Sequence, residues 1–173
     1  MRIVLLPLLM LAATPAAAQS HHNSAAPIDF GADHIELQDK ANRAILSGNV
    51  SVRQGEMTLN SARMTVSYTG QVENGSPQVS RLDASGGVTV TRPEQNARSQ
   101  YAVYDVVRRV VTMLGAVTLN QGGNSVSGGR LTINLDTGRA VIDGSSVGGG
   151  KGGGVSTSPT GRVTDRFSVP KRN

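Results

Sequence analysis

The sequence predicts an all-β protein, and three observations support this prediction. Apolar side chains alternate with polar ones at 49–53, 63–68, 88–91 and 131–136, which is the pattern of strands with one buried face. No stretch of ten or more residues carries a helical stripe, and we interpret residues 101–111, which are β-branched and aromatic, as strand. Residues that tolerate the backbone angles of tight turns separate the alternating stretches. They are Gly55, Gly70, Asn74, Gly75, Gly86, Gly87, Gly122, Gly123, Asn124, Gly128, Gly129 and Gly138.

The first 18 residues have the features of an export signal. Arg2 supplies a positive charge, residues 3–13 are apolar apart from Pro7, and Ala16-Ala17-Ala18 fits the small-x-small cleavage pattern. The apolar run is too short to span a bilayer as a helix. We therefore expect export and cleavage after Ala18, with an uncleaved anchor as the alternative.

Composition divides the remaining chain into three parts. Residues 19–27 form a polar lead that we expect to be flexible, and residues 28–147 carry the strand signals of one domain. Residues 148–173 begin with a glycine-rich run and continue as a basic tail without periodicity, which predicts disorder.

Net charge and amino-acid composition limit the classes of molecule that the protein is expected to bind. The formal net charge is +5 at pH 7, and loss of Arg2 with the signal lowers it to +4. This balance suits acidic partners without selecting among them. The chain has five aromatic residues, too few to stack nucleic-acid bases, so we expect no nucleic acid. It has no cysteine, so packing and hydrogen bonds alone must hold the fold.

Short segments of the sequence repeat. Residues 42–48 resemble residues 138–144, with a weaker copy at 109–115, and Gly-x-Val recurs at 48–50, 86–88 and 115–117. Such repeats indicate similar strand-turn-strand units, each of which cannot bury its apolar face alone. Stacked units would form a long, curved sheet over a shared interior.

Several of these residues form a set that resembles the OstA-like family of lipopolysaccharide-export proteins. The set opens with Ala-Asp-x-Ile-Glu at 32–36 and continues with Gly-Asn-Val at 48–50 and Gln-Gly at 54–55. Further matches lie at 62–66, 115–124, 129–131 and 136–140. The resemblance covers about residues 28–147, and the glycine-rich run and basic tail that follow depart from the family pattern.

The resemblance implies a fold, a ligand and partners. The fold is the OstA-like β-jelly-roll, a curved antiparallel sheet folded like a taco over an apolar slot. The slot holds the acyl chains of lipid A, and no cofactor is implied. Copies join head to tail in the periplasm, relaying lipopolysaccharide between the inner-membrane and outer-membrane components of its export machinery. Strand addition between residues 28–38 of one copy and 139–147 of another would make this joint.

The alternation supplies the side chains that would line such a slot. They are aliphatic, with methionine and one ring: Val50, Val52, Met57, Leu59, Met64, Val66, Val88, Val90, Tyr101, Val103, Val117, Leu119, Leu131, Ile133 and Leu135. The alternation itself is equally consistent with a closed core, and the slot follows from the resemblance. By position, Arg53, Arg63 and Arg81 are candidate contacts for lipid A phosphates or simply solvated surface residues.

Catalytic and metal chemistry find little support. His21 and His22 lie in the lead, and His34 has no Gly-x-Ser-x-Gly nucleophile motif to work with. Asp33 and Glu36 are three residues apart on a strand, so they face opposite sides and cannot converge on one substrate. The glycine runs lack the Gly-Lys-Ser/Thr of a phosphate loop. We therefore expect neither a metal site nor an enzyme.

Two functions remain. The first is binding and transport of lipopolysaccharide. The second is a structural one, in which a periplasmic β-solenoid scaffolds other proteins and holds no lipid.

Overall fold

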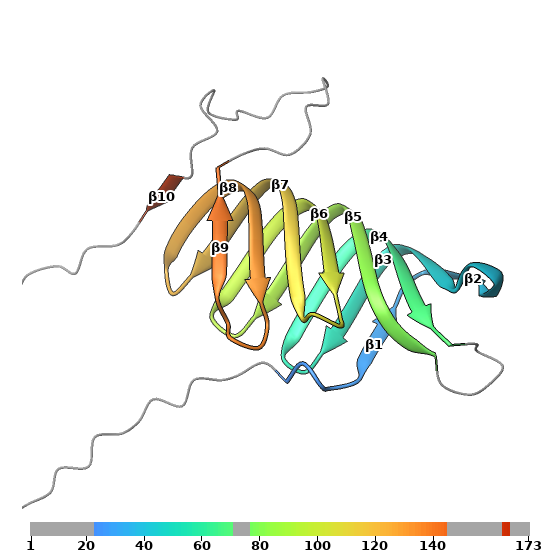
Figure 1. The fold of residues 1–173 in the computed structure, drawn as a ribbon. Helices are drawn as coiled ribbons and strands as arrows, with labels where there is room; N and C mark the ends of the chain where they lie inside the picture. The colour runs from blue at the N-terminus through green and yellow to red at the C-terminus, as the bar shows by residue number, and fades with distance from the viewer. Residues whose placement is uncertain (1–22, 71–76, 145–163, 167–173) are drawn as a thin grey trace, which may run out of the picture.

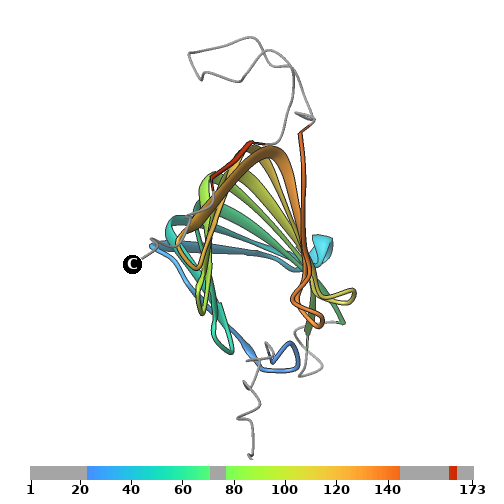
Figure 2. The same cartoon turned by 90° about the vertical axis from the view of Figure 1, so that its left-hand side faces the viewer.

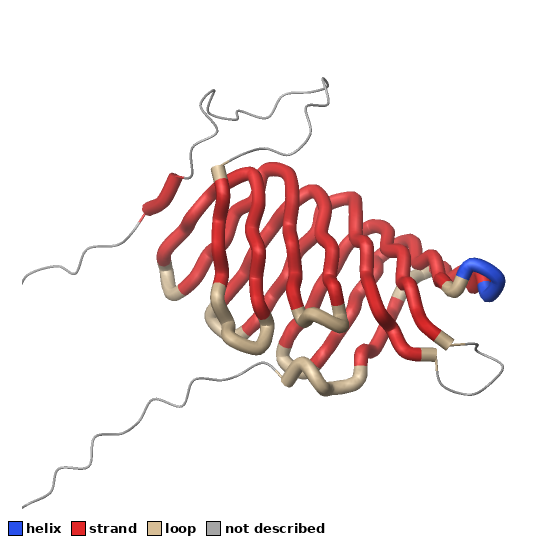
Figure 3. The backbone as a smooth tube through the Cα atoms, viewed as in Figure 1, coloured by secondary structure: helices blue, strands red, loops and turns tan. Residues whose placement is uncertain are grey.

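The protein is built from antiparallel β-strands. The computed structural model describes residues 23–70, 77–144 and 164–166, and the predicted signal peptide lies outside them. The elements are β1 (Ile28–Gly31), β2 (His34–Gln38), the short 3₁₀ helix η1 (Asp39–Ala41), β3 (Arg43–Gln54), β4 (Met57–Thr69), β5 (Gln78–Arg92), β6 (Gln95–Asp105), β7 (Val110–Gln121), β8 (Asn124–Asn134), β9 (Ala140–Asp143) and β10 (Thr164–Arg166). The strands form one curved sheet (Figures 1 and 3), which confirms the predicted all-β jelly-roll.

The sheet follows the chain order through its centre and carries two short strands at each end. Strands β3 to β8 form successive antiparallel pairs, β1 and β2 both pair with β3, and β9 and β10 both pair with β8. Each short strand pairs with only three to five residues of its long neighbour, on one side of that neighbour's middle. Both ends of the sheet are therefore split in two.

Every long strand changes register near its middle. The pairing of β3 with β4 is interrupted between Ser47 and Val50, and the pairing of β7 with β8 between Leu114 and Val117. The pairs between them show equivalent interruptions. Because bulges bend a strand and these ones line up across the sheet, the sheet folds over along that line (Figure 2).

Two kinds of bulge alternate along this fold line. Strands β3, β5 and β7 contain two consecutive residues with φ between 46° and 83°, at Gly48-Asn49, Gly86-Gly87 and Gly115-Ala116. The left-handed region is costly for residues with a Cβ and is tolerated best by glycine and asparagine, which explains the glycine that opens each pair. Strands β4, β6 and β8 instead leave a single residue unpaired, namely Ala62, Gln100 and Gly129.

The fold line divides the sheet into two arms. The β9 arm contains β2, β9 and residues 43–47, 63–69, 78–85, 101–105, 110–114 and 130–134. The β1 arm contains β1, β10 and residues 50–54, 57–61, 88–92, 95–99, 117–121 and 124–128. The buried aliphatic side chains lie between the two arms and form one hydrophobic cluster.

Two of the predicted turns are wrong. Gly86-Gly87 and Gly128-Gly129 lie inside β5 and β8, where they bend a continuous strand instead of ending it. Gly55 and Gly122-Gly123 do connect strands, and Asn74-Gly75 lies outside the described residues. The stretch 101–111 is not one strand, because residues 106–109 turn the chain from β6 into β7. Glycine suits both a hairpin turn and a bulge, so glycine alone does not distinguish them.

The tail returns to the sheet at one point. The sequence predicts disorder throughout 148–173, and the structure describes three residues of this range as β10, which pairs antiparallel with residues 125–127 of β8. The rest of the tail lies outside the described residues. Within the described part of the chain, no helix has the length and hydropathy needed to cross a membrane.

The fold line can be tested with two neighbouring glycines. Gly86 and Gly87 have φ values of 83° and 78°, but a Cβ on Gly86 would lie 2.7 Å from the Cβ of Ala62, whereas a Cβ on Gly87 meets nothing within 4 Å. We expect Gly87→Ala to cost only the left-handed penalty, about 1–2 kcal/mol. Gly86→Ala should cost roughly 1–3 kcal/mol more because it also overpacks the bend. Urea unfolding measures both, and equal losses would contradict this account of the fold line.

Candidate functional site

The interior between the arms is lined by most of the side chains that the sequence predicted. Thirteen of the fifteen are between 0 % and 6 % exposed: Val50, Val52, Met57, Leu59, Met64, Val66, Val88, Val90, Val117, Leu119, Leu131, Ile133 and Leu135. They belong to one cluster that both arms contribute to. The interior surface is therefore aliphatic, and in the described chain its own side chains fill it closely enough to exclude water.

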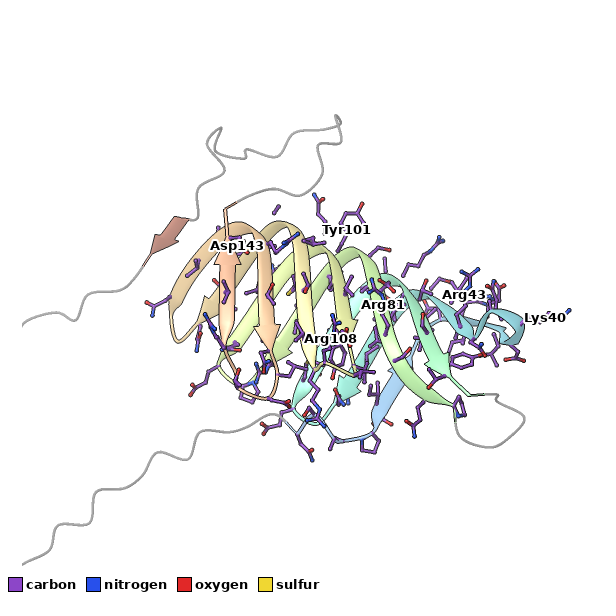
Figure 4. All side chains as sticks on the ribbon, in the orientation of Figure 1. Lys40, Arg43, Arg81, Tyr101, Arg108 and Asp143 are labelled. Carbon is purple, nitrogen blue, oxygen red and sulfur yellow. The ribbon has the colours of Figure 1, made fainter. Side chains whose placement is uncertain are left out.

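The other two predicted lining residues are wrong. Tyr101 is 55 % exposed and projects from the outside of the sheet (Figure 4), and Val103 faces the same side. The physical reason is the single-residue bulge at Gln100, which reverses the inward side of β6, so that Ala102 and Tyr104 point into the interior instead. Tyr101 and Val103 share one face of the strand, and Ala102 and Tyr104 share the other. Each face therefore has one aromatic and one aliphatic residue, so the alternation could not show which face points inward.

Sequence reasoning also missed several lining residues. They are Ala44, Leu46, Leu82, Ala84, Ala97, Ala102, Tyr104, Val111 and Met113, all buried in the same cluster. Ala44, Leu46, Val111 and Met113 lie inside the repeated segments 42–48 and 109–115, and this repetition is the signal that could have found them. The alanines outside these segments carry no such signal, because alanine is common on both faces of a strand.

The interior continues to the β2 end of the sheet. Ile35 and Leu37 of β2 are paired with the inward-facing Leu46 and Ala44, yet they are 48 % and 61 % exposed because none of the described strands pairs with the other edge of β2. At the other end, Ala140 and Ile142 of β9 pack against the cluster. Apolar side chains therefore line the inner face from one open end of the sheet to the other.

One polar contact crosses the interior between the arms. The Tyr104 hydroxyl of the β9 arm donates a hydrogen bond of 2.6 Å to Oε1 of Gln54 in the β1 arm, and both side chains are buried. Gln54 Nε2 donates to the carbonyls of Ser24 and Ala26 at 2.9 and 3.1 Å. Because an unpaired amide inside an aliphatic core is costly, Gln54 is compatible with this position only while these partners stay in place.

The segment before β1 joins both arms. Residues 23–26 form a turn held to the β1 arm by Gln54, and the Ser24 hydroxyl donates to Oδ1 of Asp136 in the β8–β9 connection at 2.7 Å. Oδ2 of the same carboxylate forms an ion pair of 3.2 Å with Arg109, at the end of the β9 arm. The predicted flexible lead is thus fixed at these residues, where it spans the mouth between the arms. Figure 2 shows this segment passing below the open side of the fold.

The predicted phosphate contacts face away from the interior. Arg53 and Arg63 are exposed and alternate with the buried residues Val52 and Met64. Arg81 is exposed too, and its guanidinium forms a 2.7 Å ion pair with Asp83 (Figure 4 labels Arg81). The hydrogen bonds to Asp83 raise the pKa of Arg81 above its ordinary value. The structure brings none of the three to the mouth between the arms.

The acidic residues at the start of the domain have structural partners. Oδ2 of Asp33 accepts a hydrogen bond of 2.8 Å from Asn49, and its backbone N–H donates to the carbonyl of Gly48, so Asp33 fixes the bulge in β3. Glu36 accepts from Gln38. Among the residues that the structure describes, no cluster of three or more potential metal ligands occurs.

Comparisons with known proteins agree with this architecture. Residues 30–139 match the profile of the family described as LptA/(LptD N-terminal domain) LPS transport protein. The chain belongs to this family. It is 32 % identical over 121 residues to uncharacterized protein R00383 of Rhizobium meliloti (strain 1021). The aligned region covers 68 % of this chain and only 65 % of the length of that protein. The family assignment therefore rests on residues that include both arms and the fold line.

A solved structure shares the fold of this LptA/LptD-type chain. The crystal structure of LptH, the LptA homologous periplasmic component of the conserved lipopolysaccharide transport device from Pseudomonas aeruginosa, superposes with a TM-score of 0.69. The match covers 86 % of this chain and 99 % of LptH at 19 % identity. At that identity the likeness concerns the fold, which is the folded, open sheet described above.

The contact between Tyr104 and Gln54 leads to a prediction about alkaline stability. Burial raises the pKa of Tyr104 from 10.0 to about 12, so the folded protein holds this proton more tightly than the unfolded chain does. The resulting stability is complete below pH 10 and is lost as pH rises from 10 to 12. We expect Tyr104→Phe to lower stability at pH 7 by about 1–3 kcal/mol, because Gln54 Oε1 loses its donor. The variant should also lose less stability than the parent between pH 10 and 12.

Unfolding by urea at pH 7, 10 and 12 measures both effects. Tyr101→Phe is the matched control, since its side chain lies outside the sheet. An unchanged alkaline profile in Tyr104→Phe would show that Tyr104 does not supply this dependence.

Proposed function

We propose that the protein binds the acyl chains of lipid A between its two arms and relays lipopolysaccharide across the periplasm. The observation that carries the proposal is the continuous aliphatic inner face, which begins at the exposed Ile35 and Leu37 and ends at Ile142. The family supports it, because its members are described as lipopolysaccharide transport proteins. An unbranched hydrocarbon suits such a surface, since methionine and aliphatic side chains adapt to irregular apolar guests.

Binding requires the arms to separate. The lining side chains pack against each other, so a guest acyl chain must take the place of contacts between the arms. The exchange replaces one set of aliphatic contacts by another, which keeps its cost low. The polar contacts across the mouth, from Tyr104 to Gln54 and from Ser24 to Asp136, are the ones that opening has to break.

The two ends of the sheet support a relay between copies. β2 and β9 are edge strands of the same arm, and within the described residues each has one edge that pairs with no other strand and could accept one. A joint between β9 of one copy and β2 of the next would be head to tail, and such joints build open filaments. It would also place the exposed Ile35 and Leu37 next to Ile142 of the neighbour, so that the apolar lining continues from copy to copy. The inner-membrane and outer-membrane components of the export machinery would cap the two ends.

The alternative is a lipid-free periplasmic scaffold. The filled interior favours it, because a closed core needs no guest. The two functions differ in whether lipid reaches the inward-facing side chains. Depletion of the protein from cells also separates the two functions. Loss of a transporter makes lipopolysaccharide accumulate at the inner membrane, whereas loss of a scaffold does not.

Photocrosslinking at neighbouring positions tests lipid binding. Met64 and Val66 point inward and are 0 % and 4 % exposed, whereas Thr65 between them faces outward. With a photoreactive amino acid at position 64 or 66, we expect adducts with purified lipopolysaccharide on irradiation. The same group at position 65 is the control and should give none. Equal labelling at all three positions, or none at 64 and 66, would favour the scaffold.

A disulfide between copies tests the relay. The chain has no cysteine, so Ile35→Cys with Ile142→Cys introduces the only pair. Both side chains face the inner side of the sheet, on the edge strands β2 and β9. We expect a ladder of oxidised multimers, because a β2–β9 joint brings the two Cα atoms within the roughly 7 Å that a disulfide spans. Ile35→Cys with Val107→Cys is the control, since Val107 is 77 % exposed at the β6–β7 turn, away from either edge. A single species at high concentration, or an equal ladder in the control, would exclude this joint.

A further inference from the structure

A row of polar side chains borders the interior along the β1 arm. Arg92 at the end of β5 pairs with Gln95 of β6, Gln95 with Gln121 of β7, and Gln121 with Asn124 of β8. The four residues are thus cross-strand neighbours on four adjacent strands. We call this row the polar shelf. At the usual spacing of strands it extends for about 14 Å.

The polar shelf lies directly above the apolar lining. Two residues deeper along the same strands, Val90 pairs with Ala97, Ala97 with Leu119, and Leu119 with Val126. Residues two apart on a strand face the same side, so the shelf points to the interior side of the sheet as this apolar row does.

The two margins of the mouth differ, because on the β9 arm the charged side chains Arg109 and Asp136 pair with each other. Across the interior, the margin of the β9 arm contributes Val79, Val106 and Leu135, which pack against the hydrophobic cluster. A ligand with a hydrocarbon part and a polar part therefore meets an asymmetric entrance. Its hydrocarbon is accepted by both arms, and its polar part finds partners on the β1 arm.

Arg92 is the cation of the shelf, and it has little to balance its charge. It is partly buried, and its guanidinium makes one long hydrogen bond, 3.4 Å from Nη1 to Oε1 of Gln95. The ion pairs of the described residues involve Arg81, Arg108 and Arg109 and not Arg92. Desolvation by burial lowers the pKa of Arg92 from its ordinary value. A half-buried guanidinium with a single neutral partner is costly, and an anion would offset that cost.

The geometry points to the polar shelf as the binding site for a phosphate-bearing sugar headgroup whose acyl chains lie between the arms. Arg92 contacts the phosphate, because a planar guanidinium can bind two of its oxygens at once. The amides of Gln95, Gln121 and Asn124 contact the sugar hydroxyls, since each amide can both donate and accept. This site rests on the proposed lipid binding and adds the orientation of the ligand, with its headgroup on the β1 arm. It also replaces Arg53, Arg63 and Arg81 as the candidate phosphate contact.

Removal of the charge at Arg92 tests the site. The probes are lipid A that carries its phosphates and lipid A of the same acyl chains without them, with affinity measured by displacement of a fluorescent fatty acid. We expect Arg92→Gln to weaken binding of phosphorylated lipid A about tenfold, the usual effect of one lost charge-assisted hydrogen-bond pair. Binding of phosphate-free lipid A should change less than about twofold, because the acyl contacts remain.

Two further variants keep the test specific. Arg98→Gln is the matched control, because Arg98 is exposed on the outer face of β6, and it should bind both lipids as the parent does. Arg92→Lys keeps the charge without the planar fork and should retain an intermediate affinity for the phosphorylated form. Inorganic phosphate added as a competitor separates a lipid headgroup from free phosphate, and it should not displace the lipid at millimolar concentration.

The outcomes separate this site from the function on which it rests. Equal binding of phosphorylated lipid A by Arg92→Gln and the parent would overturn the polar shelf while leaving acyl binding intact. An equal loss in Arg98→Gln would overturn it too, because the effect would then be one of net charge. Displacement by inorganic phosphate alone would refute a lipid headgroup as the ligand. If the parent binds neither lipid, the proposed function fails and the site fails with it.

Discussion

The bend in the middle of every long strand is the constraint on which this structure depends. A strand of eleven to fifteen residues can pair with its neighbours as a flat ribbon, and then its apolar side chains would all face one open surface. The aligned bulges prevent this by turning each strand back on itself, so that one sheet supplies both walls of its own interior (Figure 2). The paired left-handed residues at positions 48–49, 86–87 and 115–116 carry the cost of that turn.

The bend also decides how the interior can respond to a guest. The two arms are continuous through the fold line, and across the mouth they are held by aliphatic packing and by a few polar contacts. In the proposed function, acyl chains replace the apolar packing, which has no directional preference, whereas the bond from Tyr104 to Gln54 has one geometry. The polar contacts therefore define the closed state. The segment at 23–26 adds a link that a chain starting at β1 would lack.

The asymmetry between the arms gives the interior a direction. One margin carries Arg92 and a row of amides, and the other carries aliphatic side chains and the Arg109–Asp136 ion pair. The ends differ as well, because β2 exposes Ile35 and Leu37 while β9 keeps Ile142 against the cluster. In the proposed function, the mouth orients a molecule that joins acyl chains to a charged sugar, and the ends pass it along. These two properties belong to different residues and can be changed independently.

The sequence by itself determined the fold class, the strands at 49–53, 63–68 and 88–91, and most of the aliphatic lining. Period-two alternation is a local property, and it survives wherever a strand has one buried face. It could not place Tyr101 and Val103, because one unpaired residue at Gln100 reverses the inward side of β6 and nothing in the local pattern marks it. Nor could it show whether Gly86-Gly87 ends a strand or bends it, or that Gln54 meets Tyr104, fifty positions later. The tertiary structure alone decided these points, since inward direction and contacts across the mouth depend on how six strands align their bulges.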